Sequence, residues 1–396
     1  MSEINDNLDD YIGGIKMIVL KHVNGYDGTG RTFENMTIII KDGKFKQIIQ
    51  DTDLCEEDEV IDCSDLFITP GLIDVHTHLG IHEEGIGLEG HDYNETSSAT
   101  TPMLRALDGI NPREQGFNDA ISSGVTTVQI MPGSANVIGG EMVILKTTGQ
   151  IVDNMIVKSP SGLKAATGEN PKRFHGSKGR MPVTRMGIAA ILREKLIEGT
   201  LYIEKLKDGK AERNLELENI AKVLKGEIPL RIHAHRADDI LTALRIKDEF
   251  NITITIEHCT EGHIIADHLA KYKDLRVSVG PTMSTRSKIE LANKGFKTLT
   301  ELARAGVPFS ITTDHPVIGI DHLMTSAILA VKHGLSEQQA FESITLNAAK
   351  HLGIDNHVGS IEIEKDADFV LWSGNPFDLR NNVVATYIDG RLVFTR

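Results

Sequence analysis

The sequence predicts an α/β protein, a (β/α)8 TIM-like barrel joined to a small composite β-sandwich formed by the N- and C-terminal segments. Three observations predict this fold class. The middle of the chain alternates short apolar stretches with stretches of helical periodicity, the apolar stretches number eight, and both ends are rich in strand-forming residues. We expect residues 69–355 to form the barrel and residues 1–68 and 356–396 to form the sandwich.

The two ends of the chain carry the same type of pattern. Each holds strand-like stretches that turn at an Asp-Gly pair, Asp42-Gly43 near the start and Asp389-Gly390 near the end. Because these β-rich ends flank an α/β middle, we expect them to pair with one another. Two separate β elements are the alternative.

The barrel strands are expected at eight apolar stretches, namely residues 68–78, 125–131, 141–147, 156–165, 229–235, 252–258, 275–280 and 308–314. Helices are expected between or after them at residues 186–207, 237–250, 299–306 and 336–353, the last with a Ser N-cap and a closing Gly. An open doubly wound sheet is the alternative, but the chain has no phosphate-binding glycine motif to favour it. Residues 80–117 read as a long loop after the first strand, typical of an active site.

Composition excludes several classes of protein. The formal net charge of −14 argues against a nucleic-acid partner. The three cysteines, Cys55, Cys63 and Cys259, form neither a disulfide framework nor a zinc knuckle. The acidic start does not resemble a signal peptide, and no apolar run approaches the roughly 18 residues that span a membrane. We therefore expect a cytoplasmic protein without a membrane partner.

Residue types that bind metals fall at the ends of predicted strands. They are His76 and His78 on the first strand, His233 and His235 on the fifth, His258 on the sixth and Asp314 on the eighth. Active sites of (β/α)8 barrels lie at this C-terminal rim, and imidazole and carboxylate suit zinc or a similar divalent metal. A single histidine at a strand end is more often an ordinary hydrogen-bonded residue. Four strands ending this way favour a metal site.

Several of these motifs resemble the amidohydrolase superfamily. TPGLIDVHTHLG is similar to its first-strand signature, IEHCTEGH and SITTDHP to its strand-six His and strand-eight Asp, and GSIEIEKDADFVLW with IDGRLVF to its C-terminal segment. The resemblance covers nearly the whole chain. The subgroup it points to is that of imidazolonepropionase-related enzymes, which includes Xaa-Pro and Xaa-Arg dipeptidase-like members.

The resemblance implies a ligand set for one or two divalent ions, with zinc expected and iron or manganese as alternatives. His76, His78 and Asp314 would bind the more buried metal, and two further histidines, His233 and His258, would bind the second. Lys164 stands where many binuclear members carry a carboxylated lysine that bridges the two metals. Glu141 is the competing residue, because some members use a Glu from the third strand, and it is also a candidate for substrate binding.

The resemblance also implies roles in catalysis and substrate binding. Asp314 would accept a proton from a metal-activated hydroxide and pass it to the leaving nitrogen as general base and acid. His235, on the same strand face as His233, is assigned a substrate-orienting role. The cationic loop over residues 168–187 could hold a substrate carboxylate through Arg185 or Arg173, or it could be a solvated surface loop.

The function these residues indicate is hydrolysis of a C–N (amide) bond in a small-molecule substrate, and a dipeptide or N-acyl amino acid is the first expectation. Three positions at which this sequence differs from related subgroups narrow the choice of substrate. Arg236 replaces a Glu typical of imidazolonepropionases, His315-Pro316 replaces their Asn-Pro pair, and Gly80 replaces an Arg typical of dihydroorotase-like members. A mononuclear deaminase or cyclic-amide hydrolase remains the alternative enzyme, and a non-catalytic barrel scaffold the alternative of another class. A homo-oligomer is expected by family analogy alone.

Overall fold

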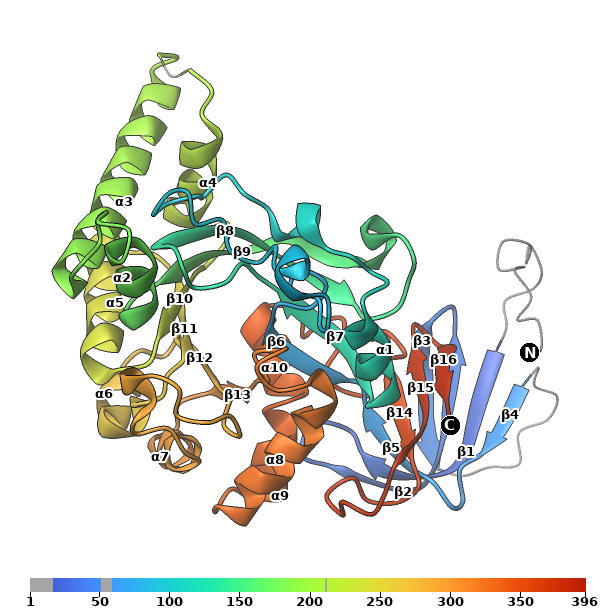
Figure 1. The fold of residues 1–396 in the computed structure, drawn as a ribbon. Coiled ribbons are helices and arrows are strands. Elements are labelled where there is room, and N and C mark those ends of the chain that lie inside the picture. The colour runs from blue at the N-terminus through green and yellow to red at the C-terminus, as the bar shows by residue number, and fades with distance from the viewer. Residues whose placement is uncertain (1–16, 51–58, 211) are drawn as a thin grey trace.

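Two β-sheets organise the molecule, as Figure 1 shows for the computed structural model, which describes residues 17–50, 59–210 and 212–396. Cys55 and the acidic start of the chain, both used above, lie outside these residues. One sheet contains the barrel strands β6 (Leu72–Thr77), β7 (Val125–Ile130), β8 (Ile138–Lys146), β9 (Ile156–Ala166), β10 (Leu230–Ala234), β11 (Ile254–His258), β12 (Arg276–Val279) and β13 (Phe309–Ile311). The other contains β1 (Met17–Tyr26), β2 (Thr32–Lys41), β3 (Lys44–Gln50), β4 (Glu59–Asp62), β5 (Phe67–Pro70), β14 (Phe369–Trp372), β15 (Val383–Ile388) and β16 (Arg391–Thr395).

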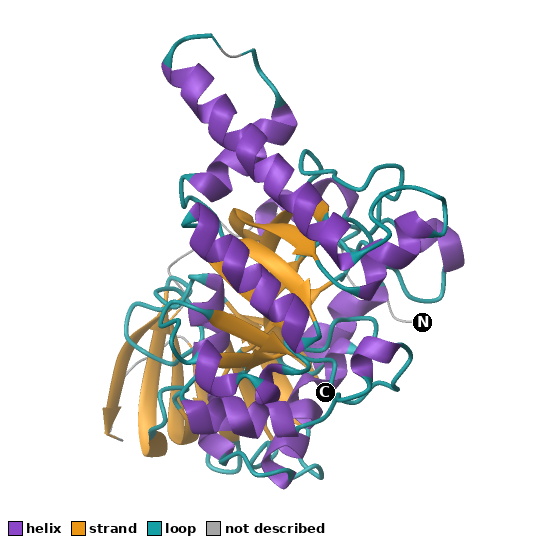
Figure 2. Ribbon diagram, turned by 90° about the vertical axis from the view of Figure 1, so that its left-hand side faces the viewer, coloured by secondary structure: helices purple, strands orange, loops and turns teal. Residues whose placement is uncertain are grey.

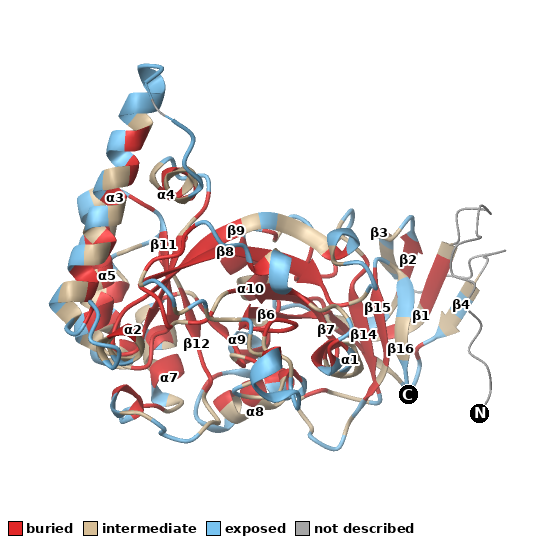
Figure 3. Cartoon of the chain, turned by 45° about the horizontal axis from the view of Figure 1, so that its top comes forward, coloured by how far each residue is buried: buried red, intermediate tan, exposed pale blue. Residues whose placement is uncertain are grey.

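All eight predicted barrel strands have a counterpart, and these follow one another around the sheet in chain order. The first, predicted over residues 68–78, is divided, because β5 joins the terminal sheet and only β6 lies in the barrel. Helices cover the outside of this sheet (Figure 2), and its strands form the most buried part of the molecule (Figure 3). The helices are α1 (Gln115–Ser122), α2 (Glu169–Gly176), α3 (Arg185–Lys207), α4 (Leu215–Leu224), α5 (Ala237–Phe250), α6 (Ala266–Leu269), α7 (Lys297–Ala305), α8 (Leu323–Lys332), α9 (Glu337–Glu342) and α10 (Leu346–Leu352). The expected TIM-like barrel is therefore observed.

The third barrel strand corrects the expectation of a uniform βα repeat. Strand β8 runs antiparallel to both β7 and β9, so β7, β8 and β9 form a meander without crossover helices. The connections over residues 131–137 and 147–155 explain this direction. A parallel crossover needs a dozen or more residues, and both connections are shorter.

Side chains join the two edges of the barrel sheet, β6 and β13. Asp74 on β6 accepts hydrogen bonds from the hydroxyls of Thr312 and Thr313 and from the Thr313 amide. The Thr312 hydroxyl also donates to the His76 carbonyl, and the His78 amide donates to the His315 carbonyl at 2.9 Å. These bonds hold the first and last strands together at the rim where the predicted metal ligands stand.

The two ends of the chain pair with each other, since β14 lies antiparallel to β5 and β5 pairs with β1. The strands of both ends join in one hydrogen-bonded sheet, and its division into two packed layers stays a prediction, as do the domain boundaries. Lys146 at the end of β8 fastens this sheet to the barrel, because its Nζ lies 2.7, 3.2 and 3.4 Å from carboxylate oxygens of Asp368, Asp366 and Asp389.

The helices depart from the sequence prediction in two places. The segment 336–353 forms α9 and α10 rather than one helix, although the predicted capping box at Ser336 and the left-handed closing Gly353 are both observed. The cationic segment 168–187 is not all loop, because α2 begins within it at Glu169. Among the described residues, no helix is long and apolar enough to cross a membrane.

Candidate metal centre

Predicted ligands from five strands of the barrel gather around one cavity of about 650 Å³. Its lining includes His76, His78, His233, His235, His258 and Asp314. These residues stand at or just beyond the carboxyl ends of β6, β10, β11 and β13, and Lys164 lies beside them near the end of β9. The sequence prediction of strand-end placement is thus observed for the whole set.

An inner group forms around Asp314. Its Oδ1 lies 3.4 Å from His76 Nε2 and 3.3 Å from His78 Nε2, and ligand atoms of His76, His258 and Asp314 lie within 4.8 Å of one another. The neighbouring histidines hold the pKa of the Asp314 carboxyl well below its usual range, despite burial that acts in the opposite direction. Asp314 is therefore an ionised carboxylate at the centre of an imidazole cluster.

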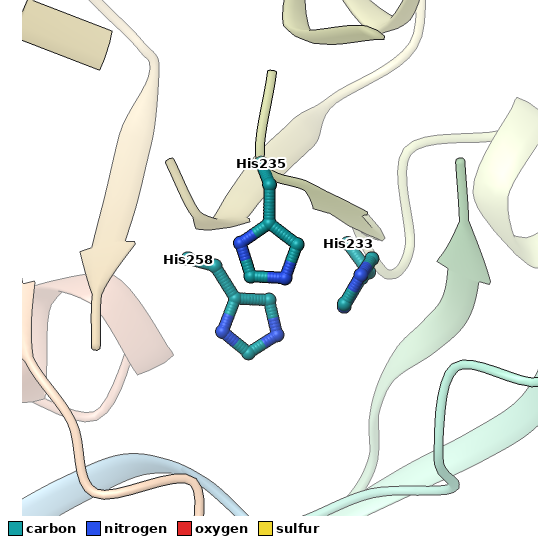
Figure 4. A group of neighbouring side chains, drawn as sticks. All are labelled: His233, His235 and His258. Carbon is teal, nitrogen blue, oxygen red and sulfur yellow. The ribbon is translucent and has the colours of Figure 1, made fainter. Parts of the chain in front are cut away.

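An outer group consists of three histidines from two adjacent strands. Ligand atoms of His233, His235 and His258 all lie within 4.8 Å of one another, and Figure 4 shows the three rings converging. The His235 and His258 rings are stacked, with centroids 4.7 Å apart. His235 lies beside His233 as expected, and its ring is 4.7 Å from that of His258, against 4.5 Å for His233, so its substrate-orienting role stays a prediction.

The backbone turns two of these residues inward. His258 has a φ of 71° and Asp314 a φ of 56°, both in the left-handed region that non-glycine residues rarely adopt. Holding a non-glycine residue in this backbone conformation costs of order 1–3 kcal/mol of folding free energy, and such residues concentrate at functional sites. For His258 the turn lets its side chain face the cavity although the preceding residue, Glu257, also points into the barrel.

Hydrogen bonds at Nδ1 fix the direction of several rings. His78 contacts the Met131 carbonyl, His258 the Gly280 carbonyl and His235 the Thr260 hydroxyl, each at 2.7 Å. A carbonyl can only accept, so His78 and His258 donate from Nδ1, and a neutral ring in this orientation carries its lone pair on Nε2. Their Nε2 atoms are available to a cation.

The donor set fits a divalent metal. Burial lowers the pKa of His76, His233, His235 and His258, so these rings are neutral at pH 7, the form that ligates metals. Both ring nitrogens of His233 are buried without a hydrogen-bond partner among the described residues. Buried polar atoms left unpaired in this way are rare, and a bound cation would account for the ring nitrogen that carries the lone pair.

Lys164 has the burial and the neighbours expected of a lysine that becomes carboxylated. Its side chain is fully buried, and its Nζ lies 3.3 Å from His76 Nε2 and 3.0 Å from Met131 Sδ. Desolvation lowers the pKa of its amine to about 8. The neutral amine that reacts with carbon dioxide is therefore roughly a tenth of the population at pH 7, far more than for an ordinary lysine with a pKa of about 10.4.

The structure does not bring two of the predicted substrate-binding residues to the cavity. Glu141 on β8 forms an ion pair with Lys222, with 2.6 Å between Oε1 and Nζ. Arg185 at the start of α3 forms one with Asp239, with 3.0 Å between Nε and Oδ2. Neither lines the cavity. Strand β8 turns Glu141 toward α4, and the buried Asp239 carboxylate holds Arg185. Arg173, carried by α2, does line the cavity.

The sequence did not predict two further candidate residues, Lys288 and Glu290. Lys288 lines the cavity, and its Nζ lies 2.7 Å from Glu290 Oε1, which is itself 3.7 Å from the Nε2 atoms of both His233 and His235. Both residues come from the irregular segment after β12, where no strand end marks them. Their nearness to the histidines follows from the path of the loop.

Comparisons with known proteins place this chain beside amidohydrolases. The model of the amidohydrolase family matches residues 186–393. The crystal structure of an amidohydrolase from Thermotoga maritima MSB8 is 40% identical, has a TM-score of 0.93, and is aligned over 96% of this chain and 100% of that one.

Two curated relatives are more distant in sequence. The amidohydrolase tasK of Hapsidospora irregularis is 28% identical over 85% of this chain, and the match spans only 37% of that protein's length. An imidazolonepropionase from Rhizobium meliloti (strain 1021) is 25% identical over 81% of this chain and 80% of its own length.

Proposed function

Because this chain belongs to the amidohydrolase family, whose members hydrolyse C–N bonds, we propose that it is a metal-dependent hydrolase of a small amide. The observation that carries the proposal is the convergence of five histidines and one ionised aspartate on one cavity, with the buried Lys164 beside His76. A scaffold protein that had lost catalysis would not need to retain this set.

The ligand roles follow the two groups. His76, His78 and Asp314 would hold an inner cation, and His233 with His258 an outer one. Lys164, as the carbamate formed when its neutral amine adds carbon dioxide and loses a proton, would join them. Support for this role comes from its burial and from its contact with His76. His235 is close enough to serve as an additional outer ligand.

A bound divalent cation would supply a Lewis acid that polarises the scissile carbonyl and lowers the pKa of water. Asp314 would then move the proton. Its carboxylate is ionised and can accept a proton from the attacking water, then deliver it to the leaving nitrogen. His78, 3.3 Å from Asp314 Oδ1, keeps that carboxylate in place at the cavity floor.

The cavity favours a substrate that carries a carboxylate. Two of its lining residues, Arg173 and Lys288, are cationic, and Asp314 is the acid among the lining residues. Phe174, Met283 and Leu291 add an apolar wall. A dipeptide or an N-acyl amino acid combines a scissile amide, a carboxylate and an apolar side chain, and it fits a volume of about 650 Å³.

A cyclic amide of the imidazolone type is the second candidate, favoured by the imidazolonepropionase relatives. The identity and the contacts of Arg236 argue against a cyclic-amide substrate. This residue replaces the expected Glu, and its side chain is exposed and bound to Asp238 at 2.9 Å, pointing away from the chemistry.

Metal analysis and a substrate panel test the proposal together. Purified protein should contain between one and two equivalents of divalent metal, zinc first among them, and should hydrolyse at least one N-acyl amino acid or dipeptide. Well under one equivalent of metal, with no activation by zinc, manganese or iron, would contradict the proposal. Turnover of imidazolone propionate alone would favour the second candidate. A cytoplasmic location and a homo-oligomeric state stay predictions.

A further inference from the structure

Glu257 is a fully buried carboxylate directly beneath the proposed metal centre. It lies on β11 next to His258, inside the barrel rather than in the cavity, and its side chain has no exposed surface. A buried charge of this kind costs several kcal/mol unless other groups compensate it. The groups that surround Glu257 therefore show what the charge does.

Four donors saturate the carboxylate of Glu257. Arg231 Nε and the Thr255 hydroxyl donate to Oε1 at 2.8 and 2.7 Å, and the Ser278 hydroxyl and His76 Nδ1 donate to Oε2 at 2.6 and 2.9 Å. An ionised carboxylate only accepts hydrogen bonds. His76 must therefore carry its proton on Nδ1, which leaves the lone pair of Nε2 directed at Lys164 and Asp314.

Arg231 keeps this carboxylate charged and fixed. Its guanidinium is 1% exposed, and its second nitrogen donates to the Val75 carbonyl at 3.1 Å and to His351 Nε2 at 3.1 Å. The pair is neutral as a whole, so it adds no net charge to the barrel interior. It nevertheless presents a full negative charge to one histidine of the cluster.

The Nδ1 atoms of the other oriented histidines lack such a partner, and the Glu290 oxygen near His235 lies 3.7 Å from its Nε2, beyond hydrogen-bond distance. His78 and His258 donate to backbone carbonyls, and His235 contacts the Thr260 hydroxyl, all of them uncharged groups. Hydrogen bonding to a carboxylate makes an imidazole more basic and a stronger ligand than bonding to a neutral acceptor does. The inner and outer halves of the centre are thus built unequally.

We propose that Glu257 and Arg231 are positioning residues that orient and strengthen His76, so that the inner half of the centre binds its cation more tightly than the outer half. This inference rests on the proposed metal-dependent function. Neither residue of the buried pair lines the cavity, so the pair would act on the centre through His76.

Zinc affinity of the native enzyme and of two matched variants tests this inference. Glu257→Gln keeps the shape of the side chain and removes its charge, and Thr260→Val removes the neutral partner of His235. Metal-free protein is titrated with zinc against a competing chelator, and cobalt(II) is added in parallel to record the visible spectrum of each site. Urea unfolding of the metal-free proteins serves as the measure of fold integrity.

The expected result is a 10–100-fold loss of affinity at the tighter site in Glu257→Gln, with a changed cobalt spectrum there and an unchanged weaker site. Thr260→Val should leave the tighter site as in the native protein. Equal affinities in native protein and Glu257→Gln would overturn the inference alone, as would an equal loss in both variants. Native protein that binds no metal would overturn the proposed function as well.

The double variant Arg231→Met/Glu257→Gln keeps the test decisive if Glu257→Gln fails to fold. It removes both charges and leaves none unpaired, and replacing a buried ion pair as a unit is often tolerated. The double variant should fold and show the same weakened site. Native affinity in a folded double variant would refute the positioning role.

Discussion

Removal of the Lys146 ammonium should weaken the attachment of the terminal sheet to the barrel and lower the free energy of unfolding. In Lys146→Met the apolar stem is kept, but the carboxylates of Asp366, Asp368 and Asp389 lose their shared cation. Asp368 decides the magnitude, because its side chain is 3% exposed and its partner is 10% exposed. Breaking a buried pair on one side costs about 3–5 kcal/mol, and the more exposed Asp389 adds at most about 1 kcal/mol.

The assay uses the single tryptophan of the chain. Trp372 lies on β14, donates from its indole to the Thr69 hydroxyl, and reports on the terminal sheet. With chelator present to remove metal, urea unfolding followed by fluorescence should show a midpoint lower by about 1 M or more, for an m-value of about 3 kcal/mol/M. Lys210→Met is the matched control, since its partner Asp208 is 61% exposed and the expected loss is under about 1 kcal/mol.

The pH dependence of the same deficit has a definite sign. Burial raises the pKa of Asp368 above its ordinary value even with Lys146 present. A carboxyl whose pKa is raised on folding stabilises the protein below its unfolded pKa, and this stabilisation is lost as the pH rises through the folded pKa. The deficit of Lys146→Met should therefore be largest at neutral pH and shrink in acid. A loss below about 1 kcal/mol at pH 7.5, or a deficit that grows in acid, would refute the reasoning.

Three further predictions concern the metal centre. Asp314→Asn should lower kcat at least about 10²-fold through loss of the proton carrier, while circular dichroism stays native; unchanged turnover would rule out the assigned role. Lys164→Met should reduce bound zinc by about one equivalent, which elemental analysis measures, whereas Glu141→Gln should keep the native metal content because its carboxylate pairs with Lys222. Lys288→Met should raise KM for a carboxylate substrate about tenfold or more, with a smaller change in kcat. For a neutral amide substrate, the variant and the native protein should have equal KM values if Lys288 recognises the substrate's charge.

Much of the site was predictable because strand ends concentrate it. A histidine pair at i and i+2 faces one side of a strand, and the carboxyl ends of barrel strands share one rim, so His76, His78 and His233 could be placed together from spacing alone. His258 and Asp314 were predicted by position as well, although the left-handed backbone that turns them inward has no signal in the sequence.

The parts that escaped prediction depend on tertiary packing. The antiparallel direction of β8 was in principle readable from two short connections, and the uniform βα pattern hid it. Glu257 carries a signal, a lone acid within an apolar strand, but its partner Arg231 on another strand could be recognised only in three dimensions. Lys288 and Glu290 reach the cavity along an irregular loop, for which spacing gives no rule.

The pairing of β5 with β14 determines when the terminal sheet can be completed during translation. Strand β5 ends two residues before the first barrel strand begins, yet its partner is almost 300 residues later in the chain. At about 5–20 residues per second, translation leaves that edge uncovered for roughly 15–60 seconds. An unpaired strand edge is a template for intermolecular association, so this edge of the nascent chain is exposed to such pairing until β14 emerges.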